Sequence, residues 1–178
     1  MQANLLEPLR IAIRDVPDFP QKGILFKDIT PVLADPHLMK LAIDGMVEPF
    51  AGLKIDKVVG IDARGFIFGS MIAQRLNAGF VPVRKKGKLP WKTIGVDYSL
   101  EYGTNRVEMH VDAIQPGEKV LLADDLLATG GTAAAALHLI LQAGAELLGS
   151  TFFIELGFLK GRTQLDSTGP VHSLLNFG

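Results

Sequence analysis

The chain has 178 residues, of which 48% are hydrophobic and 21% are charged, and its formal net charge is −1. This length favours a single folded domain with a sizeable core, and the near-zero charge argues against a general nucleic-acid binder. The absence of cysteine excludes disulfides and thiolate metal sites, and without a signal sequence or an apolar run as long as a membrane span we expect a cytoplasmic protein.

Basic residues are concentrated in one part of the sequence. Between residues 63 and 96 there is no acidic residue, but there are seven basic ones: Arg64, Arg75, Arg84, Lys85, Lys86, Lys88 and Lys92. Elsewhere the remaining 11 basic residues are outnumbered by 19 acidic residues. We therefore expect residues 63–96 to contribute to an anion-binding site.

The N-terminal part mixes a short helix with a segment that has no clear period. Leu5, Leu9 and Ile13 have helical spacing and predict a short amphipathic helix. Residues 19–31 combine Pro and Gly with large apolar residues, and composition alone favours a wall segment with buried aromatic side chains. Asp35 is typical of an N-cap and predicts that a helix begins directly after it.

A first strand, loop and helix follow in the middle of the chain. Residues 57–61 predict a buried strand and residues 66–76 a helix, with a loop at residues 62–65 between them. Arg64 therefore lies at a helix N-terminus, where its guanidinium suits a pair of diphosphate oxygens. An ion pair with Asp62, or an exposed side chain, explains this arginine equally well.

The next strand, residues 80–83, leads into a basic run at residues 84–92. Such a run is either a solvated loop or a lid that closes when a polyanion cancels its charge. Alternating side chains then predict two paired strands, residues 98–102 and 107–111, with a turn at residues 103–105.

The most informative stretch is a second strand, loop and helix. An apolar strand at residues 120–123 is followed by Asp124 and Asp125, then by a small, Gly- and Thr-rich loop at residues 128–132 and a helix at residues 133–141. Small residues and a helix N-terminus together suit a phosphate. The two carboxylates would repel a phosphate, so ribose hydroxyls or a magnesium ion fit them better. An ordinary junction with a chance acidic pair is the alternative.

The whole chain predicts a doubly wound α/β fold with a mostly parallel sheet. Strands alternate with helices, and further strands are expected at residues 150–156 and 171–175. Ligand loops in such folds lie at the carboxyl ends of the strands. The four histidines do not have the spacing of metal ligands, so a zinc site is not expected.

The chain resembles the type I phosphoribosyltransferases over nearly its whole length, and three segments carry the resemblance. The sequence Asp-Asp-Leu-Leu-Ala-Thr-Gly-Gly-Thr at residues 124–132 resembles the family's ribose-5-phosphate signature, in the form typical of its adenine-specific members. Residues 62–66 are similar to the family's diphosphate loop, with Ala63 in place of the usual serine. Residues 25–27 are similar to its adenine-binding hood, with Lys27 in place of a common arginine.

The resemblance implies a reaction and a domain organisation. It implies transfer of the phosphoribosyl group from phosphoribosyl diphosphate to adenine, a purine-salvage step that gives AMP and diphosphate. Mg²⁺ is expected to be carried by the diphosphate, without a direct protein ligand that can be named. The implied organisation is a single domain, 1–178, with a hood at 1–34 and a flexible catalytic loop at 84–102. A homodimer is expected, without nucleic-acid or membrane partners.

The resemblance also assigns roles to individual residues. Catalysis is assigned to Glu101, Arg64 and Tyr102, with Glu101 managing a proton of the base. The ribose and 5-phosphate are assigned to Asp124, Asp125, Ala128, Thr129, Gly130, Gly131 and Thr132. The diphosphate is assigned to Arg64, Arg84, Lys85 and Lys88, and adenine to Leu25, Phe26, Lys27 and Leu156.

Two kinds of alternative stay open at this point. The base choice depends on the resemblance alone, so hypoxanthine, guanine, xanthine, uracil and orotate are alternatives to adenine. A regulator that senses phosphoribosyl diphosphate would use the same fold but normally needs a DNA-binding helical domain. The first thirty residues are too short for one, and their acidic residues cancel the charge of their basic residues.

Overall fold

The computed structural model describes residues 5–100, 103–165 and 168–178. The chain divides into two compact units, Met1–Gly45 and Met46–Gly178, which we describe separately. Among the described residues, no helix combines the length and the apolar character that crossing a membrane requires.

The first unit contains a two-stranded antiparallel sheet and helices. Its elements are α2 (Glu7–Ala12), β1 (Arg14–Pro17), β2 (Leu25–Asp28), α3 (Thr30–Ala34) and most of α4 (Pro36–Val47). Val16 of β1 lies opposite Phe26 of β2, and the ring of Phe19 packs edge-on against that of Phe26 at 5.1 Å. The expectation of buried aromatic side chains is wrong for Phe19, which is 51% exposed.

The predicted N-cap at Asp35 is confirmed. Its carboxylate Oδ1 accepts hydrogen bonds from the backbone N–H groups of His37 at 2.8 Å and Leu38 at 3.1 Å. Two otherwise unpaired donors of the first turn of α4 are thereby satisfied, and this fixes where α4 begins.

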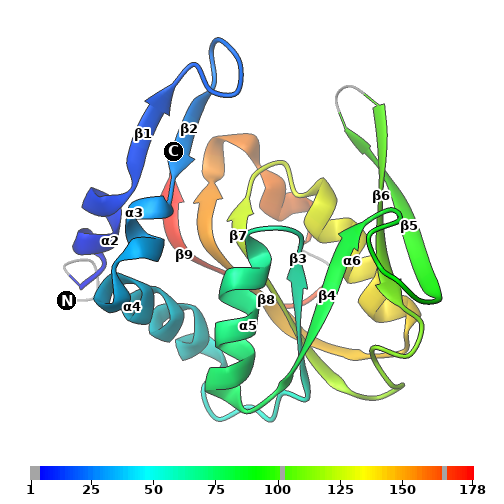
Figure 1. Cartoon of the computed structure of the whole chain (residues 1–178). Coiled ribbons are helices and arrows are strands. Elements are labelled where there is room, and N and C mark those ends of the chain that lie inside the picture. The colour runs from blue at the N-terminus through cyan, green and yellow to red at the C-terminus, as the bar shows by residue number, and fades with distance from the viewer. Residues whose placement is uncertain (1–4, 101–102, 166–167) are drawn as a thin grey trace. The chain divides into compact units, whose positions relative to one another are not determined.

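The second unit is built around a seven-stranded sheet (Figure 1). Its strand order is β5-β6-β4-β3-β7-β8-β9, in which β4, β3, β7, β8 and β9 are parallel, and β6 is antiparallel to its two neighbours, β4 and β5. The elements are η1 (Glu48–Phe50), β3 (Lys57–Ile61), α5 (Gly65–Leu76), β4 (Gly79–Lys85), β5 (Thr93–Leu100), β6 (Gly103–His110), β7 (Lys119–Leu127), α6 (Gly131–Gln142), β8 (Glu146–Leu156), η2 (Gly157–Leu159), η3 (Gly161–Gln164) and β9 (Val171–Phe177).

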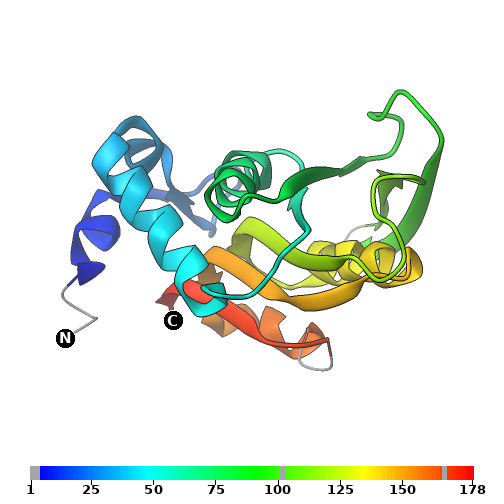
Figure 2. The same cartoon turned by 90° about the horizontal axis from the view of Figure 1, so that it is seen from below.

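Helices α5 and α6 cover opposite faces of this sheet. Phe68 of α5 stacks on Phe153 of β8, with ring centroids 5.1 Å apart. The neighbouring Phe152 belongs instead to the buried cluster that contains Leu137 and Ile140 of α6. Because successive strand residues point to opposite faces, the two helices lie on the two sides of β8, and Figure 2 shows α5 lying to one side of the strands. The predicted doubly wound α/β fold is confirmed.

Close packing brings α5 against the end of β3. A Cβ atom on Gly60 of β3 would lie 2.6 Å from the ring of Phe80, and one on Gly69 of α5 would lie 2.9 Å from the same ring. Only glycine fits at such distances, so α5 approaches the sheet closely. This packing fixes the loop between β3 and α5.

Two boundaries differ from the sequence prediction. Strand β7 does not end before the acidic pair but continues to Leu127, because it pairs with β8 as far as Leu127 opposite Glu155. The predicted turn at residues 103–105 is wrong, because these residues pair with β5, with Gly103 opposite Leu100. In both strands the backbone pairing with the neighbouring strand extends beyond the residues whose apolar pattern predicted the strand.

Candidate active site

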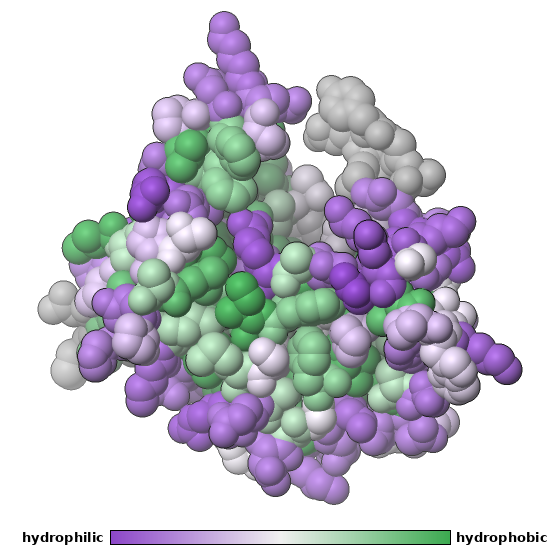
Figure 3. Space-filling view, in the orientation of Figure 1, coloured by the Kyte–Doolittle hydropathy of each residue, from purple (hydrophilic) through white to green (hydrophobic). Residues whose placement is uncertain are grey.

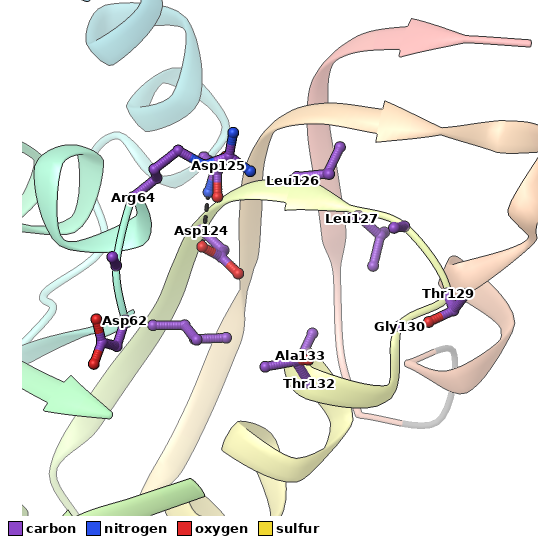
Figure 4. Close-up of a pocket in the computed structure, with 13 residues that line it drawn as sticks. Asp62, Arg64, Asp124, Asp125, Leu126, Leu127, Thr129, Gly130, Thr132 and Ala133 are labelled. Atoms are coloured by element: carbon purple, nitrogen blue, oxygen red, sulfur yellow. Dashed lines mark hydrogen bonds and ion pairs between the residues drawn. The ribbon is translucent and has the colours of Figure 1, made fainter. Parts of the chain in front are cut away.

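The candidate site is a pocket where two loops leave the middle of the sheet. After β3 the chain continues to β4 on one side, and after β7 it continues to β8 on the other. Ligands bind in such folds at this point, where the strand order reverses. A pocket of about 290 Å³ lies there (Figure 4). It is lined by Ile61, Asp62, Ala63, Arg64, Asp124, Asp125, Leu126, Leu127, Ala128, Thr129, Gly130, Thr132 and Ala133.

The start of α5 contacts the acidic end of β7 beside the pocket. Arg64 is the residue before α5, and the peptide bond between Asp62 and Ala63 is cis. A Cβ atom on Gly65 would collide with the carboxylate of Asp124. Glycine therefore allows the N-terminus of α5 to touch the acidic end of β7.

In the acidic pair Asp124 is half-buried, and Asp125 is buried and already holds an arginine. The Oδ2 atom of Asp125, a residue only 7% exposed, lies 2.8 Å from Nε of Arg64. The backbone N–H of Asp125 donates to Oδ1 of Asp124 at 2.9 Å, as the dashed line in Figure 4 marks. Of the two explanations offered for Arg64, the ion pair with Asp62 is wrong, because the guanidinium pairs with Asp125.

Burial changes the acidity of both carboxyl groups. Desolvation, followed by repulsion from Asp125, raises the pKa of Asp124 well above the ordinary carboxyl value. Desolvation also raises the pKa of Asp125, and the charge of Arg64 opposes this effect. Ionising these two desolvated carboxyl groups costs free energy, so the pocket favours a ligand that donates hydrogen bonds to them or carries positive charge.

The loop after β7 has the geometry of a phosphate site. Gly130 has a φ of 85°, a left-handed conformation that favours glycine, and α6 begins at the next residue. The first backbone hydrogen bond of α6 runs from the N–H of Ala134 to the carbonyl of Gly130. The N–H groups of residues 131–133 therefore have no partner within the helix and are available at its N-terminus, which lines the pocket. The hydroxyl of Thr132 donates to the phenol oxygen of Tyr98 at 3.3 Å.

The basic run is held by acidic side chains. Nε of Arg84 lies 3.0 Å from Oδ2 of Asp62, and its NH1 group donates to the carbonyl of Lys88 at 3.0 Å. The N–H of Gly87 donates to Oε2 of Glu108 at 3.0 Å. Arg84 thus links the basic run to the pocket through Asp62.

Most of the predicted ribose and 5-phosphate residues come together in the pocket. Asp124, Asp125, Ala128, Thr129, Gly130 and Thr132 line it together with Arg64, and Gly131 begins α6 beside them. Lys85 and Lys88 are exposed and are not among the lining residues, nor is Leu156, which ends β8.

The remaining predicted residues lie elsewhere in the chain. Leu25, Phe26 and Lys27 form part of β2 in the first unit, where Nζ of Lys27 lies 2.6 Å from Oδ1 of Asp15. Glu101 and Tyr102 lie outside the described residues.

Two polar residues in or beside the pocket were not assigned a role of their own. Asp62 was considered as a partner of Arg64 and as part of residues 62–66, and Tyr98 only as a strand residue. Each is linked to its partner across a long stretch of sequence, Asp62 to Arg84 and Tyr98 to Thr132. Spacing along the chain gives no signal for such contacts.

The described residues contain no group of three or more His, Cys, Asp or Glu side chains that could hold a metal ion. The pocket offers the neighbouring carboxylates of Asp124 and Asp125. One or two carboxylates suit Mg²⁺ that arrives bound to a phosphorylated ligand and retains several waters.

Comparison with known proteins assigns this site to a family. Residues 35–174 match the phosphoribosyl transferase domain. The chain is 58% identical over 173 residues to the adenine phosphoribosyltransferase of Anaeromyxobacter dehalogenans, covering 97% of this chain and 100% of that one. The chain belongs to the phosphoribosyltransferase family, and within it to the adenine phosphoribosyltransferases.

Solved structures of relatives share the whole fold. The adenine phosphoribosyltransferase of Rhodothermus marinus is 57% identical, with a TM-score of 0.95 over 98% of this chain and 99% of that one. The Saccharomyces cerevisiae enzyme, solved with D-2,5-dideoxy-2,5-imino-altritol 1,6-bisphosphate and adenine, is 44% identical, with a TM-score of 0.91 over 97% and 99% of the two chains.

Proposed function

We propose that this chain transfers the 5-phosphoribosyl group of phosphoribosyl diphosphate to adenine, giving AMP and diphosphate. The observation that carries this proposal is the order of groups in the pocket. An acidic pair lies between an arginine that suits a diphosphate and a helix N-terminus that suits a phosphate. Phosphoribosyl diphosphate has the matching order of diphosphate, ribose and phosphate. The yeast relative, solved with a bisphosphate and adenine, supports the same ligands.

The acidic pair is proposed to hold the ribose. In the reaction the bond from C1′ to the diphosphate oxygen breaks, the bond from C1′ to a ring nitrogen of adenine forms, and that nitrogen loses its proton. Positive charge develops on the sugar ring as the bond to the diphosphate oxygen breaks and before the bond to adenine is complete. Asp124 and Asp125 accept hydrogen bonds from the ribose hydroxyls and place negative charge near the ring.

Substrate binding is proposed to exchange the partner of Arg64. In the structure this guanidinium is paired with Asp125. A diphosphate is a stronger partner for an arginine fork, and ribose hydroxyls replace the arginine on Asp125. The exchange lets Arg64 and Asp125 each keep a partner, which matters for Asp125 because an unpaired buried charge is costly.

The 5-phosphate is proposed to bind at the start of α6. The backbone N–H groups and hydroxyls of residues 128–132 supply donors, and the dipole of the 12-residue helix adds about 0.3–1 kcal/mol at an exposed site. Most of the affinity therefore depends on how accurately the loop presents its donors.

Arg84, Lys85 and Lys88 are proposed to contact the diphosphate together with Arg64. Mg²⁺ supplies charge neutralisation of the leaving group when it is bound there. Arg84 can reach this position from its present one, because its partner Asp62 already lines the pocket.

Recognition of the base is proposed from the resemblance. Phe26 and Leu156 are assigned to the two faces of adenine, and the backbone of Leu25 and Lys27 to its edge. Glu101 is proposed to take the proton, with Tyr102 beside it. Phe26 lies on a short strand braced by Phe19, which favours a fixed ring orientation.

A homodimer and a cytoplasmic location are likewise proposed, as is a single functional domain. The exposed apolar side chains of α5 support the dimer: Ile67 and Met71 are 39% and 40% exposed, and Figure 3 shows apolar side chains gathered over this helix. A second copy of the chain is the partner we propose for this face.

Competition between bases tests the proposed function. The purified enzyme is given labelled phosphoribosyl diphosphate, Mg²⁺ and equal concentrations of adenine, hypoxanthine, guanine, xanthine, uracil and orotate. AMP is expected to be the dominant product. A dominant nucleotide of another base would reject adenine specificity, and retention of the substrate without any nucleotide product would favour the sensor alternative.

A further inference from the structure

The phosphate loop rests against a second backbone segment with no side chain between them. Gly161, the first residue of η3, is buried. A Cβ atom there would overlap the carbonyl oxygen of Ala128 and lie 2.8 Å from the backbone nitrogen of Gly130. A Cβ atom on Gly130 would in turn overlap the carbonyl oxygen of Gly161. The loop and η3 are therefore in direct backbone contact.

An arginine fixes the position of this second segment. Nε of Arg162 lies 3.1 Å from Oε1 of Glu155, and its NH2 group lies 2.5 Å from Oε2, so the pair is bidentate. The same guanidinium donates to the carbonyl of Val171 at 2.6 Å and to Oγ of Ser173 at 3.2 Å. Arg162 thus ties η3 to β8 and β9 at once.

The carboxylate of this pair belongs to the scaffold of the site. Glu155 is only 4% exposed, and it lies opposite Leu127, the last residue of β7 before the phosphate loop. Hydrogen bonds from Arg162 lower the pKa of Glu155, so the carboxylate is ionised at neutral pH. The phosphate loop and the η3 segment that contacts it are therefore both attached to the same end of the sheet, where β7 and β8 pair.

Apolar packing anchors the other end of η3. Leu165, which follows η3, is fully buried. It belongs to the same cluster as Leu127, before the loop, and Ala133 and Ala136, in the first turns of α6. The η3 segment is thus held at both ends, by an ion pair and by the core.

We propose that the segment Gly161–Leu165, fixed by the Glu155–Arg162 ion pair, is the back wall that positions the 5-phosphate loop, with Arg162 as its positioning residue. The donors of the guanidinium are engaged by Glu155, Val171 and Ser173, and Glu155 cancels its charge, so Arg162 acts through Gly161 and does not bind the phosphate. Backbone donors hold a phosphate well only when they are accurately placed, and small displacements cost much of the affinity. This inference rests on the proposed function of the loop.

The test separates loop order from ligand binding. Hydrogen–deuterium exchange of the peptide that covers residues 128–132 is measured in the ligand-free enzyme, and the affinities for AMP and adenosine are measured by calorimetry. The variants are Gly161→Ala, Arg162→Met and Arg162→Lys, and the control is Gln164→Ala, an exposed side chain of the same η3 segment.

Faster exchange in the loop and a loss of AMP affinity of about tenfold or more are expected for Gly161→Ala and Arg162→Met. Adenosine lacks the 5-phosphate, so its affinity is expected to stay within about twofold of wild type. Arg162→Lys keeps the charge but not the fork, and is expected to recover part of the AMP affinity. Arg162→Lys also keeps the test decisive if Gly161→Ala does not fold.

Two other results have distinct meanings. Unchanged loop exchange and unchanged AMP affinity in the Arg162 variants would overturn the back wall, as would equal losses for AMP and adenosine. Faster loop exchange in the variants, together with a wild-type enzyme that does not prefer AMP to adenosine, would support the back wall and reject the proposed phosphate site.

Discussion

The two anion-binding regions of the pocket are built in different ways. The loop at residues 128–132 uses backbone groups at a helix N-terminus, and it is braced from behind by Gly161. The opposite region uses side chains, and in the empty protein these are occupied: Arg64 by Asp125, and Arg84 by Asp62. One region is ready for its ligand, whereas the other must exchange partners before it can bind one. Binding of the 5-phosphate is therefore expected to need little rearrangement, and binding of the diphosphate more.

Removal of Asp125, which is proposed to hold the ribose between the two regions, is expected to have the largest effect. Asp125→Ala removes a proposed ribose contact and leaves Arg64 without its buried partner. A loss in kcat/KM on the order of 10²–10³ is expected, as for other groups that stabilise a developing charge. Steady-state kinetics with both substrates varied provides the measurement, and an enzyme with near wild-type kcat/KM would reject the ribose clamp.

A methyl group on Gly130 tests whether the phosphate loop is rigid. Gly130→Ala adds a Cβ at a φ of 85° and against the carbonyl of Gly161. A loss of stability of about 1–3 kcal/mol and a clear rise in KM for phosphoribosyl diphosphate are expected.

Gly117→Ala is the matched control for Gly130→Ala. Its φ of 82° imposes the same backbone strain, but a Cβ there meets no atom within 4 Å. The control is expected to lose stability without a change in KM. If both variants changed KM alike, close contact with η3 would not matter for phosphate binding.

Arg84 tests the exchangeable region. Arg84→Met breaks the links to Asp62 and to the carbonyl of Lys88. Because the pair with Asp62 is half-exposed, the stability change is expected to be under about 1 kcal/mol. The KM for phosphoribosyl diphosphate is expected to rise several-fold, with a smaller change in the KM for adenine.

Lys54→Met is the control for Arg84→Met. It removes an exposed cation whose partner, Asp56, lies at 3.4 Å and outside the pocket. No change in either KM is expected. Equal kinetics of the two variants would mean that Arg84 contributes only surface charge.

The last effect expected is on the stability of the empty protein and not on its kinetics. Burial raises the pKa of Asp124 in the folded state, so the folded protein binds this proton more tightly than the unfolded chain. The ionised group therefore costs stability as pH rises from the ordinary carboxyl value through the raised pKa, by about 1.4 kcal/mol for each unit of the shift.

Asp124→Asn removes this cost, and its side-chain oxygen can still accept the N–H of Asp125. The Tm of the variant relative to wild type is expected to rise between acid and neutral pH. Thermal unfolding at several pH values is the measurement. A difference that is constant with pH would contradict the raised pKa.

The sequence predicted the elements that carry the phosphate loop, because strand, glycine loop and helix are local patterns. The ranges of β3 and α5 were likewise close to the prediction, since their apolar spacing is regular. Partners outside the local pattern could not be predicted. Asp62 meets Arg84 only because the neighbouring strands β3 and β4 bring them together, and Arg162 meets Glu155 only because the chain turns back after β8 through η2 and η3.

The residues at which strands end could not be predicted from the local sequence pattern either. The acidic pair lies within β7 because pairing with β8 continues past the last apolar residues. The predicted loop after Val83 is partly strand, because Arg84 and Lys85 pair with β6. In both places hydrogen bonding to a neighbouring strand decides the conformation of polar residues.

The salt dependence of binding tests the contrast between the two regions most directly. Calorimetry of the wild-type enzyme would compare ribose 5-phosphate with Mg²⁺-diphosphate over a series of salt concentrations. Diphosphate affinity is expected to fall more steeply, because exposed cationic side chains are screened by salt, whereas buried backbone donors are screened much less. Equal slopes, or a steeper slope for ribose 5-phosphate, would contradict a backbone site for the phosphate and a side-chain site for the diphosphate.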